Sequence, residues 1–142
     1  MDSRFVLVLI GPTASGKTDL LLELFGSGAR PGLPMAELVS ADSMQVYRGM
    51  DIGTAKPSSR ERALLPHHLL DLRDPDEQYM VGDFVRLADE ACEDIASRGR
   101  LPVVAGGTGF YVRNFLFGLP SGPEADPAIR AAVARDLAES GP

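Results

Sequence analysis

A glycine-rich segment from Gly11 to Thr18 constrains the fold of this chain more than any other feature. Its sequence, Gly-Pro-Thr-Ala-Ser-Gly-Lys-Thr, matches the phosphate-loop pattern G-x-x-x-x-G-K-[ST]. The segment lies between the apolar run Phe5-Val-Leu-Val-Leu-Ile10 and a helical pattern over residues 18–25, which is the strand-loop-helix context that this motif requires. The apolar run predicts a strand that is buried on both faces of a parallel sheet.

The residues of this loop predict a site for a diphosphate or triphosphate. Glycines let backbone amides surround an anion, and the N-terminus of the following helix adds partial positive charge. Lys17 adds a full positive charge, and the Thr18 hydroxyl is a ligand for Mg²⁺. The loop alone does not distinguish a nucleotide such as ATP from another pyrophosphate. The predicted phosphate-binding residues are Gly11, Pro12, Thr13, Ala14, Ser15, Gly16, Lys17 and Thr18.

The rest of the chain alternates strand and helix patterns. Apolar runs at residues 37–40, 68–72 and 101–105 predict strands, and residues 41–57 predict a long loop with room for one short helix. Helices are predicted over residues 110–117 and from the start signal Asp126-Pro127. This alternation predicts an α/β protein with a doubly wound, mainly parallel sheet of the P-loop NTPase-like class. The clearest amphipathic helix has apolar residues at helical spacing: Phe84, Leu87, Ala88, Ala91, Cys92 and Ile95.

Composition favours one compact, soluble domain. The chain has 142 residues, of which 44% are hydrophobic, and no stretch approaches the roughly 20 apolar residues of a membrane span. The single cysteine fits a reducing compartment, so we expect a cytoplasmic monomer without a membrane partner. The 20 acidic residues outnumber the 14 basic ones, for a net charge of -6. An RNA partner would therefore be held partly by surfaces outside this chain.

The segment Ser40-Ala-Asp-Ser-Met-Gln-Val-Tyr-Arg-Gly-Met-Asp-Ile-Gly-Thr-Ala-Lys-Pro57 closely resembles the tRNA dimethylallyltransferase (isopentenylpyrophosphate transferase) family. Further matching segments extend the resemblance along nearly the whole chain: the Gly11 to Thr18 loop, Pro66-His-His-Leu-Leu-Asp71, Asp74-Pro75, Asp83-Phe84 and Gly106-Gly-Thr-Gly-Phe-Tyr111. The resemblance implies that the loop holds the pyrophosphate of dimethylallyl diphosphate, with Mg²⁺. It also implies transfer of the dimethylallyl group to the N6 amine of adenosine 37, beside the anticodon of tRNA.

The resemblance implies roles for individual residues. Asp42 matches the family's proposed general base, and Lys17 and Thr18 act on the pyrophosphate. Family members are about twice as long. Residues 1–117 then form the P-loop catalytic core, and residues 118–142 form a linker and the start of a truncated tRNA-binding region. We therefore expect this chain alone to transfer prenyl groups poorly or not at all. The positions that match tRNA contacts are Asp42, Ser43, Met44, Gln45, Thr108 and Arg130.

Several alternatives remain open at this point. Asp42 could instead be a ligand of a Mg²⁺-bound water or a loop-capping residue. Lys56 and Arg48 could reach phosphates or only solvate their loop. We expect a structural role for the adjacent pair His67 and His68, and a core position for Cys92. The alternative functions are an adenylate dimethylallyltransferase, a small P-loop kinase, and an inactive fragment that binds pyrophosphate.

Overall fold

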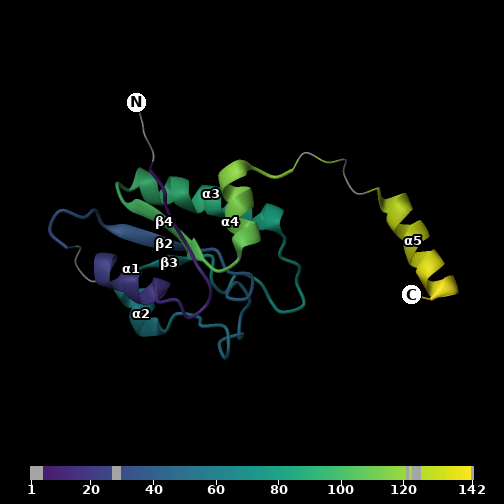
Figure 1. Ribbon diagram of the computed structural model, residues 1–142, viewed down its shortest axis with the longest axis horizontal. Helices are drawn as coiled ribbons and strands as arrows, with labels where there is room; N and C mark the ends of the chain where they lie inside the picture. The colour runs from purple at the N-terminus through teal and green to yellow at the C-terminus, as the bar shows by residue number, and fades with distance from the viewer. Residues whose placement is uncertain (1–4, 27–29, 121, 123–125, 142) are drawn as a thin grey trace.

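A four-stranded, all-parallel sheet forms the centre of the computed structural model, which describes residues 5–26, 30–120, 122 and 126–141 (Figure 1). The strand order is β1-β4-β2-β3. Each pair of neighbouring strands is parallel, as the predicted fold class requires. The strands are β1 (Leu7–Ile10), β2 (Ala36–Ser40), β3 (His67–His68) and β4 (Leu101–Gly106).

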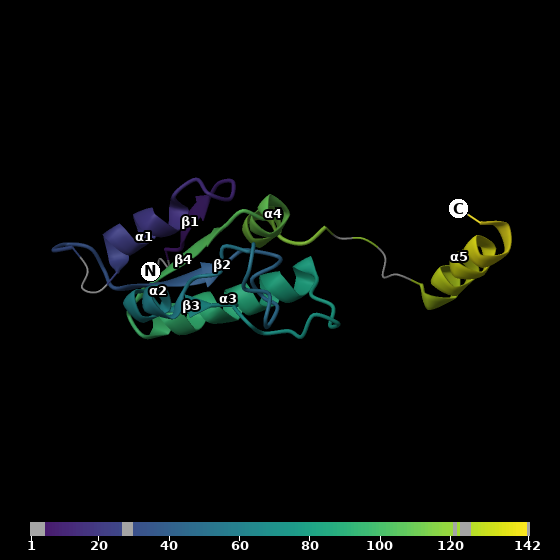
Figure 2. The ribbon, with the colours of Figure 1, turned by 90° about the horizontal axis from the view of Figure 1, so that it is seen from below.

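Helices cover both faces of the sheet (Figure 2). On one face, α1 (Lys17–Phe25) packs in a core with Leu38 and Val103, and Leu65 at the end of α2 (Ser59–Leu64) joins that core. On the other face, α3 (Val81–Ser97) and α4 (Gly109–Phe117) enclose a second core. This arrangement confirms the predicted doubly wound α/β fold.

The last helix, α5 (Pro127–Ser140), lies apart from the sheet and its covering helices (Figures 1 and 2). None of its residues is buried. It begins at the predicted signal, because the Asp126 side chain accepts a hydrogen bond from the Ala128 amide at 2.8 Å and Pro127 follows as the first helical residue. Within the described residues, no helix is both long enough and apolar enough to cross a membrane.

The strand predicted to be buried on both faces is instead an edge strand. Among the described residues β1 pairs only with β4, and Leu7 and Ile10 are 40% and 54% exposed. The prediction was wrong because a continuous apolar run does not reveal how completely the rest of the fold covers the two faces of a strand at the sheet edge.

Two further predictions differ from the structure between β2 and α3. β3 ends at His68 instead of continuing to residue 72, because Leu69 and Asp71 adopt left-handed φ values of 62° and 54° that interrupt an extended strand. Residues 41–57 are all described and none is helical, whereas α2 begins at Ser59. Ser58 and Glu61 form a capping box, so the S-x-x-E signal for this helix was present in the sequence.

The amphipathic helix predicted over residues 84–95 is confirmed as the centre of α3. Phe84, Ala88, Cys92 and Ile95 are all buried against the sheet. Burial raises the pKa of the Cys92 thiol to about 12. The predicted core position of Cys92 is therefore confirmed.

Candidate active site

A pocket of about 190 Å³ opens at the carboxyl ends of β2 and β4. Three segments line it: the phosphate loop with the start of α1, the loop that follows β2, and the glycine turn that follows β4. Ligands of open parallel sheets bind at this edge. The predicted site residues that line the pocket are Thr13, Ala14, Ser15, Gly16, Lys17, Thr18, Asp42 and Gln45.

Two residues of the phosphate loop have left-handed backbone conformations. Gly16 has φ 81°, and Ala14 has φ 62°, which is uncommon for a residue with a side chain. The Lys17 ammonium lies over the loop, where it donates hydrogen bonds to the Gly11 carbonyl at 2.7 Å and the Pro12 carbonyl at 2.6 Å. Since α1 begins at Lys17, its free N-terminal amides face the same pocket as this charge.

The turn at residues 106–108 joins the phosphate loop to the segment that contains Asp42. The Gly11 amide donates to the Gly106 carbonyl at 3.4 Å, and the Thr108 amide donates to the Ala41 carbonyl at 3.2 Å. A side chain at Gly106 would place its Cβ 2.1 Å from the Ala41 carbonyl oxygen. Only glycine therefore permits this close approach between β4 and the end of β2.

Asp42 has one carboxylate oxygen bound and one free. Its Oδ1 accepts hydrogen bonds from the Met44 amide at 2.8 Å and the Gln45 amide at 3.2 Å. Its Oδ2 has no hydrogen bond to any described residue, and the side chain lines the pocket. Asp42 therefore caps its loop through Oδ1, which fixes the orientation of the carboxylate. Oδ2 remains available to a bound substrate.

Gln45 holds the loop that borders the pocket. Its Oε1 accepts a hydrogen bond from the Ser40 hydroxyl at 3.0 Å, and its Nε2 donates to the carbonyls of Thr54 and Ala55 at 3.1 and 3.0 Å. The side-chain amide predicted to contact tRNA is thus engaged within the protein.

Lys56 is an internal anchor of the same loop. Its side chain is 2% exposed, and its ammonium donates hydrogen bonds of 2.7 Å to the Tyr47 carbonyl, Asp51 Oδ1 and Asp71 Oδ1. Burial opposes the charge, but the hydrogen bonds with both carboxylates outweigh it and raise the pKa of Lys56. Asp71 also pairs with Arg62 at 2.9 Å. Of the two roles weighed for Lys56, this geometry favours the one within the loop.

The adjacent histidines have different environments. His68 pairs with Glu37 at 2.6 Å, and neither of these two residues lines the pocket. The His67 ring lies in the pocket lining, and its Nδ1 donates to the Leu65 carbonyl at 2.6 Å. Burial lowers the pKa of His67, so the neutral ring is favoured. No cluster of three or more metal-binding His, Cys, Asp or Glu side chains occurs among the described residues.

Some pocket residues were not predicted, and some predicted residues lie elsewhere. Sequence reasoning missed several residues of the lining, although the position of Ser40 at the end of a parallel strand was a signal for it. Thr108 lies beside the pocket, where its Oγ1 accepts from the Ser43 amide at 3.1 Å. Met44 is 43% exposed, and Arg130 lies on α5, away from the pocket. The missed lining residues include Ser40, Thr54, Ala55, Pro57 and His67.

This fold and pocket define a P-loop protein whose phosphate loop shares one pocket with a carboxylate. The chain belongs to the IPP transferase family, whose family model matches residues 45–142. The resemblance seen in the sequence is thereby confirmed.

Individual relatives agree with this assignment. A tRNA dimethylallyltransferase of Anaeromyxobacter sp. (strain K) is 53% identical over 136 residues, which cover 96% of this chain and 43% of the relative. The full-length tRNA isopentenylpyrophosphate transferase of Bacillus halodurans is 40% identical with a TM-score of 0.70, over 97% of this chain and 44% of that one. A eukaryotic dimethylallyltransferase acting on tRNA is 30% identical with a TM-score of 0.69, over 96% and 32%. The chain thus spans less than half the length of these relatives.

Proposed function

We propose that this chain provides the donor-binding and proton-accepting residues of a tRNA dimethylallyltransferase. The enzyme moves the dimethylallyl group from dimethylallyl diphosphate to the exocyclic amine of an adenosine beside the tRNA anticodon. One observation carries the proposal: the phosphate loop and the free oxygen of Asp42 belong to a single pocket. Residues 1–117 form the catalytic core in this proposal, and residues 118–142 lead towards tRNA contacts.

The phosphate loop stabilises the leaving group. An adenine amine is a weak nucleophile, so the allylic C–O bond must break early and negative charge grows on the departing diphosphate. Lys17 and the N-terminal amides of α1 lie where they can bind that charge. The binding residues are those of the loop: Gly11, Pro12, Thr13, Ala14, Ser15, Gly16, Lys17 and Thr18.

The residues of the pocket also fit a magnesium ion. Mg²⁺ keeps several waters and takes only one or two protein ligands together with phosphate oxygens, so it needs no preformed cluster of carboxylates. Thr18 lines the pocket beside Lys17, and its hydroxyl would be the protein ligand of the ion. When bound, the ion would neutralise part of the charge on the diphosphate.

Asp42 accepts the proton that the amine loses when it is alkylated. The two amides on Oδ1 hold the carboxylate in one orientation, and Oδ2 remains available to the amine. Met44 bonds to Asp42 through its amide and Thr108 bonds to the Ser43 amide, so Ser43, Met44 and Thr108 are proposed tRNA contacts beside this carboxylate. Gln45 would act by shaping the loop, and Arg130 would contact tRNA from α5.

Calorimetry with inorganic pyrophosphate and Mg²⁺ tests the two halves of this assignment separately. Removal of a charge-assisted contact in Lys17→Ala should weaken binding about 10- to 150-fold, from the ~1.5–3 kcal/mol of such a bond. Asp42→Asn should bind pyrophosphate as the unaltered chain does. Equal affinities for Lys17→Ala and the unaltered chain would contradict the donor site.

Single-turnover transfer to tRNA, measured with this chain restored to the full length of its relatives, tests the base. Asp42→Asn retains the size and the hydrogen bonds of the aspartate but loses its basicity, so the transfer rate should fall about 10²- to 10⁴-fold. If the rate is unchanged and pyrophosphate binding weakens instead, Asp42 belongs to the donor site and the proposed base is wrong.

A further inference from the structure

The outer face of α4 carries aromatic and basic side chains that the described residues leave uncovered. Phe110 is 59% exposed and Phe117 is 82% exposed, and Arg113 between them is also exposed. Arg113 makes no hydrogen bond or ion pair with any described residue. The opposite face of α4 packs Tyr111 and Val112 into the core. Phe110, Arg113 and Phe117 thus form an exposed stripe apart from the buried side chains of α4, and Leu116 of the same helix is also 53% exposed.

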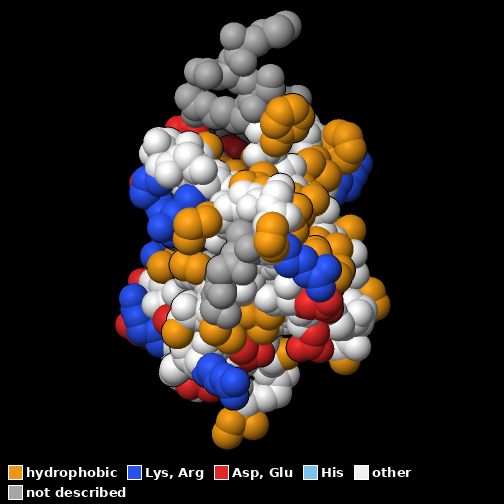
Figure 3. Space-filling model, turned by 90° about the vertical axis from the view of Figure 1, so that its left-hand side faces the viewer, with side chains coloured by type: hydrophobic (Ala, Val, Ile, Leu, Met, Phe, Trp, Pro, Cys, Tyr) orange, Lys and Arg blue, Asp and Glu red, His pale blue; other side chains and the backbone are white. Residues whose placement is uncertain are grey.

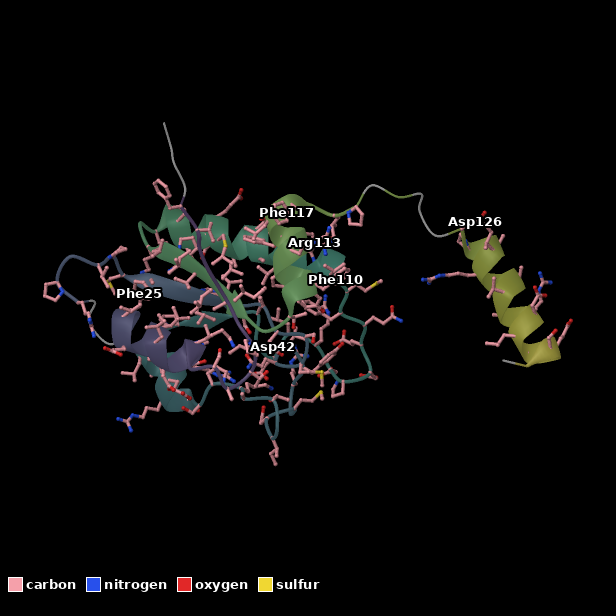
Figure 4. The ribbon with its side chains drawn as sticks, viewed as in Figure 1. Phe25, Asp42, Phe110, Arg113, Phe117 and Asp126 are labelled. Atoms are coloured by element: carbon pink, nitrogen blue, oxygen red, sulfur yellow. The ribbon has the colours of Figure 1, made fainter. Side chains whose placement is uncertain are left out.

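This stripe begins beside the candidate base. The Thr108 side chain, immediately before α4, accepts the hydrogen bond from the Ser43 amide next to Asp42. Figure 4 shows Phe110 at the end of α4 nearer Asp42, with Arg113 and Phe117 following along the helix. At ~1.5 Å of rise per residue, Arg113 lies about one turn beyond Phe110, and Phe117 lies about 10 Å beyond it. A nucleotide next to one held at Asp42 therefore meets Phe110 first.

The chemistry of the stripe suits single-stranded RNA. Unpaired bases stack on aromatic rings, and guanidinium groups bind phosphates. Two other exposed arginines, Arg48 and Arg86, already have partners, since Arg48 pairs with Asp74 and Arg86 pairs with Glu90. On the face shown in Figure 3, basic and acidic side chains are mixed, so that face is not uniformly basic.

We propose that Phe110 and Arg113 form an RNA contact that flanks the acceptor adenosine. Phe110 stacks on a neighbouring base, and Arg113 pairs with a backbone phosphate. Phe117 lies too far along the helix to share this contact. The inference rests on the proposed function, because it assigns the RNA partner of that same site to a surface of α4.

Fluorescence anisotropy with a labelled RNA stem-loop, whose loop carries the acceptor adenosine, measures this contact. Phe110→Ala should weaken binding about 5- to 150-fold, the equivalent of the ~1–3 kcal/mol of one stacked base, and leave the salt dependence unchanged. Arg113→Gln should lower the slope of log affinity against log salt by about 0.7, as expected for one lost phosphate contact on a single strand. Arg86→Gln and Phe117→Ala are matched controls that should change neither quantity.

The outcomes separate this inference from the proposed function. If the unaltered chain binds the RNA, and Phe110→Ala and Arg113→Gln bind it with the same affinity and salt slope, the α4 contact is wrong and the function stands. If the unaltered chain does not bind the RNA, the α4 contact is wrong, whereas pyrophosphate binding by this chain and prenyl transfer by the full-length enzyme still decide the proposed function. If Phe110→Ala and Phe117→Ala change the oligomeric state or melting temperature without changing RNA affinity, α4 packs against protein and the RNA contact is refuted.

Discussion

Replacing Glu37 by glutamine should destabilise the fold by removing one charge from a buried ion-pair cluster. The Glu37 side chain is 3% exposed, on β2 in the middle of the sheet. Its carboxylate accepts hydrogen bonds from Arg98 at the end of α3, from Arg100 before β4 and from His68 on β3. One side chain therefore ties together four elements of the fold.

The size of the effect follows from the pKa of this carboxyl group. The Arg98 hydrogen bonds, helped by His68 and Arg100 and opposed by burial, lower the pKa of Glu37 from 4.5 to about 2. At ~1.4 kcal/mol per pKa unit, the ionised cluster contributes roughly 3 kcal/mol at neutral pH. Because the two arginines are 39% and 35% exposed, water solvates them after the substitution, and we expect Glu37→Gln to cost ~2–3 kcal/mol.

Urea unfolding followed by circular dichroism measures this difference across pH. The folded-state pKa is depressed, so the contribution of Glu37 is fully present above pH 4.5 and is lost as the pH falls towards about 2. The two proteins should therefore become equally stable in strong acid. Glu90→Gln, which breaks an exposed pair on α3, is the control and should cost about 0.5 kcal/mol or less. A loss below about 1 kcal/mol at neutral pH, or a difference that persists in acid, would refute the argument.

Three further substitutions or reactions probe the scaffold. Gly106→Ala should cost at least about 3 kcal/mol in urea unfolding, because its Cβ would lie 2.1 Å from the Ala41 carbonyl oxygen. Cys92 should react with a thiol reagent, followed by absorbance, only after unfolding, because it is 6% exposed and its pKa is raised to about 12. Lys56→Met should leave the Asp71 carboxylate without its buried partner and increase proteolytic cleavage within residues 42–57, measured by mass spectrometry.

Local patterns predicted most of the fold because each element carries its own periodicity. The phosphate loop lies between a β-branched run and a helix, and α3 repeats its apolar residues at helical spacing. Local patterns do not show which strands pair in the sheet or where the folded chain turns. The apolar run at β1 does not show that β4 is its one partner among the described residues. Nor does the run at residues 68–72 show that Leu69 and Asp71 turn away with positive φ.

The site could be predicted where a motif fixes its own geometry, and less well where distant residues meet. The conformation of the phosphate loop is encoded within the loop itself. The bonds of Gln45 to Ser40 and Thr54, and of Lys56 to Asp71, depend on tertiary packing. The family resemblance implied a tRNA contact for Gln45, and the sequence left Lys56 open between a phosphate contact and solvation of its loop. In the folded chain both side chains hold the pocket wall.

The turn at residues 106–108 holds the phosphate loop and the Asp42 segment at a fixed distance from each other. Gly106 and Thr108 bond to Gly11 and Ala41, so backbone atoms fix the separation between the phosphate loop and the segment that carries Asp42. In the proposed function the phosphate loop binds the departing diphosphate, and Asp42 accepts the proton of the amine. The reacting carbon and nitrogen must fit between these two groups. A rigid backbone bridge maintains that separation better than two independent side chains would, because it has no rotamers to lose.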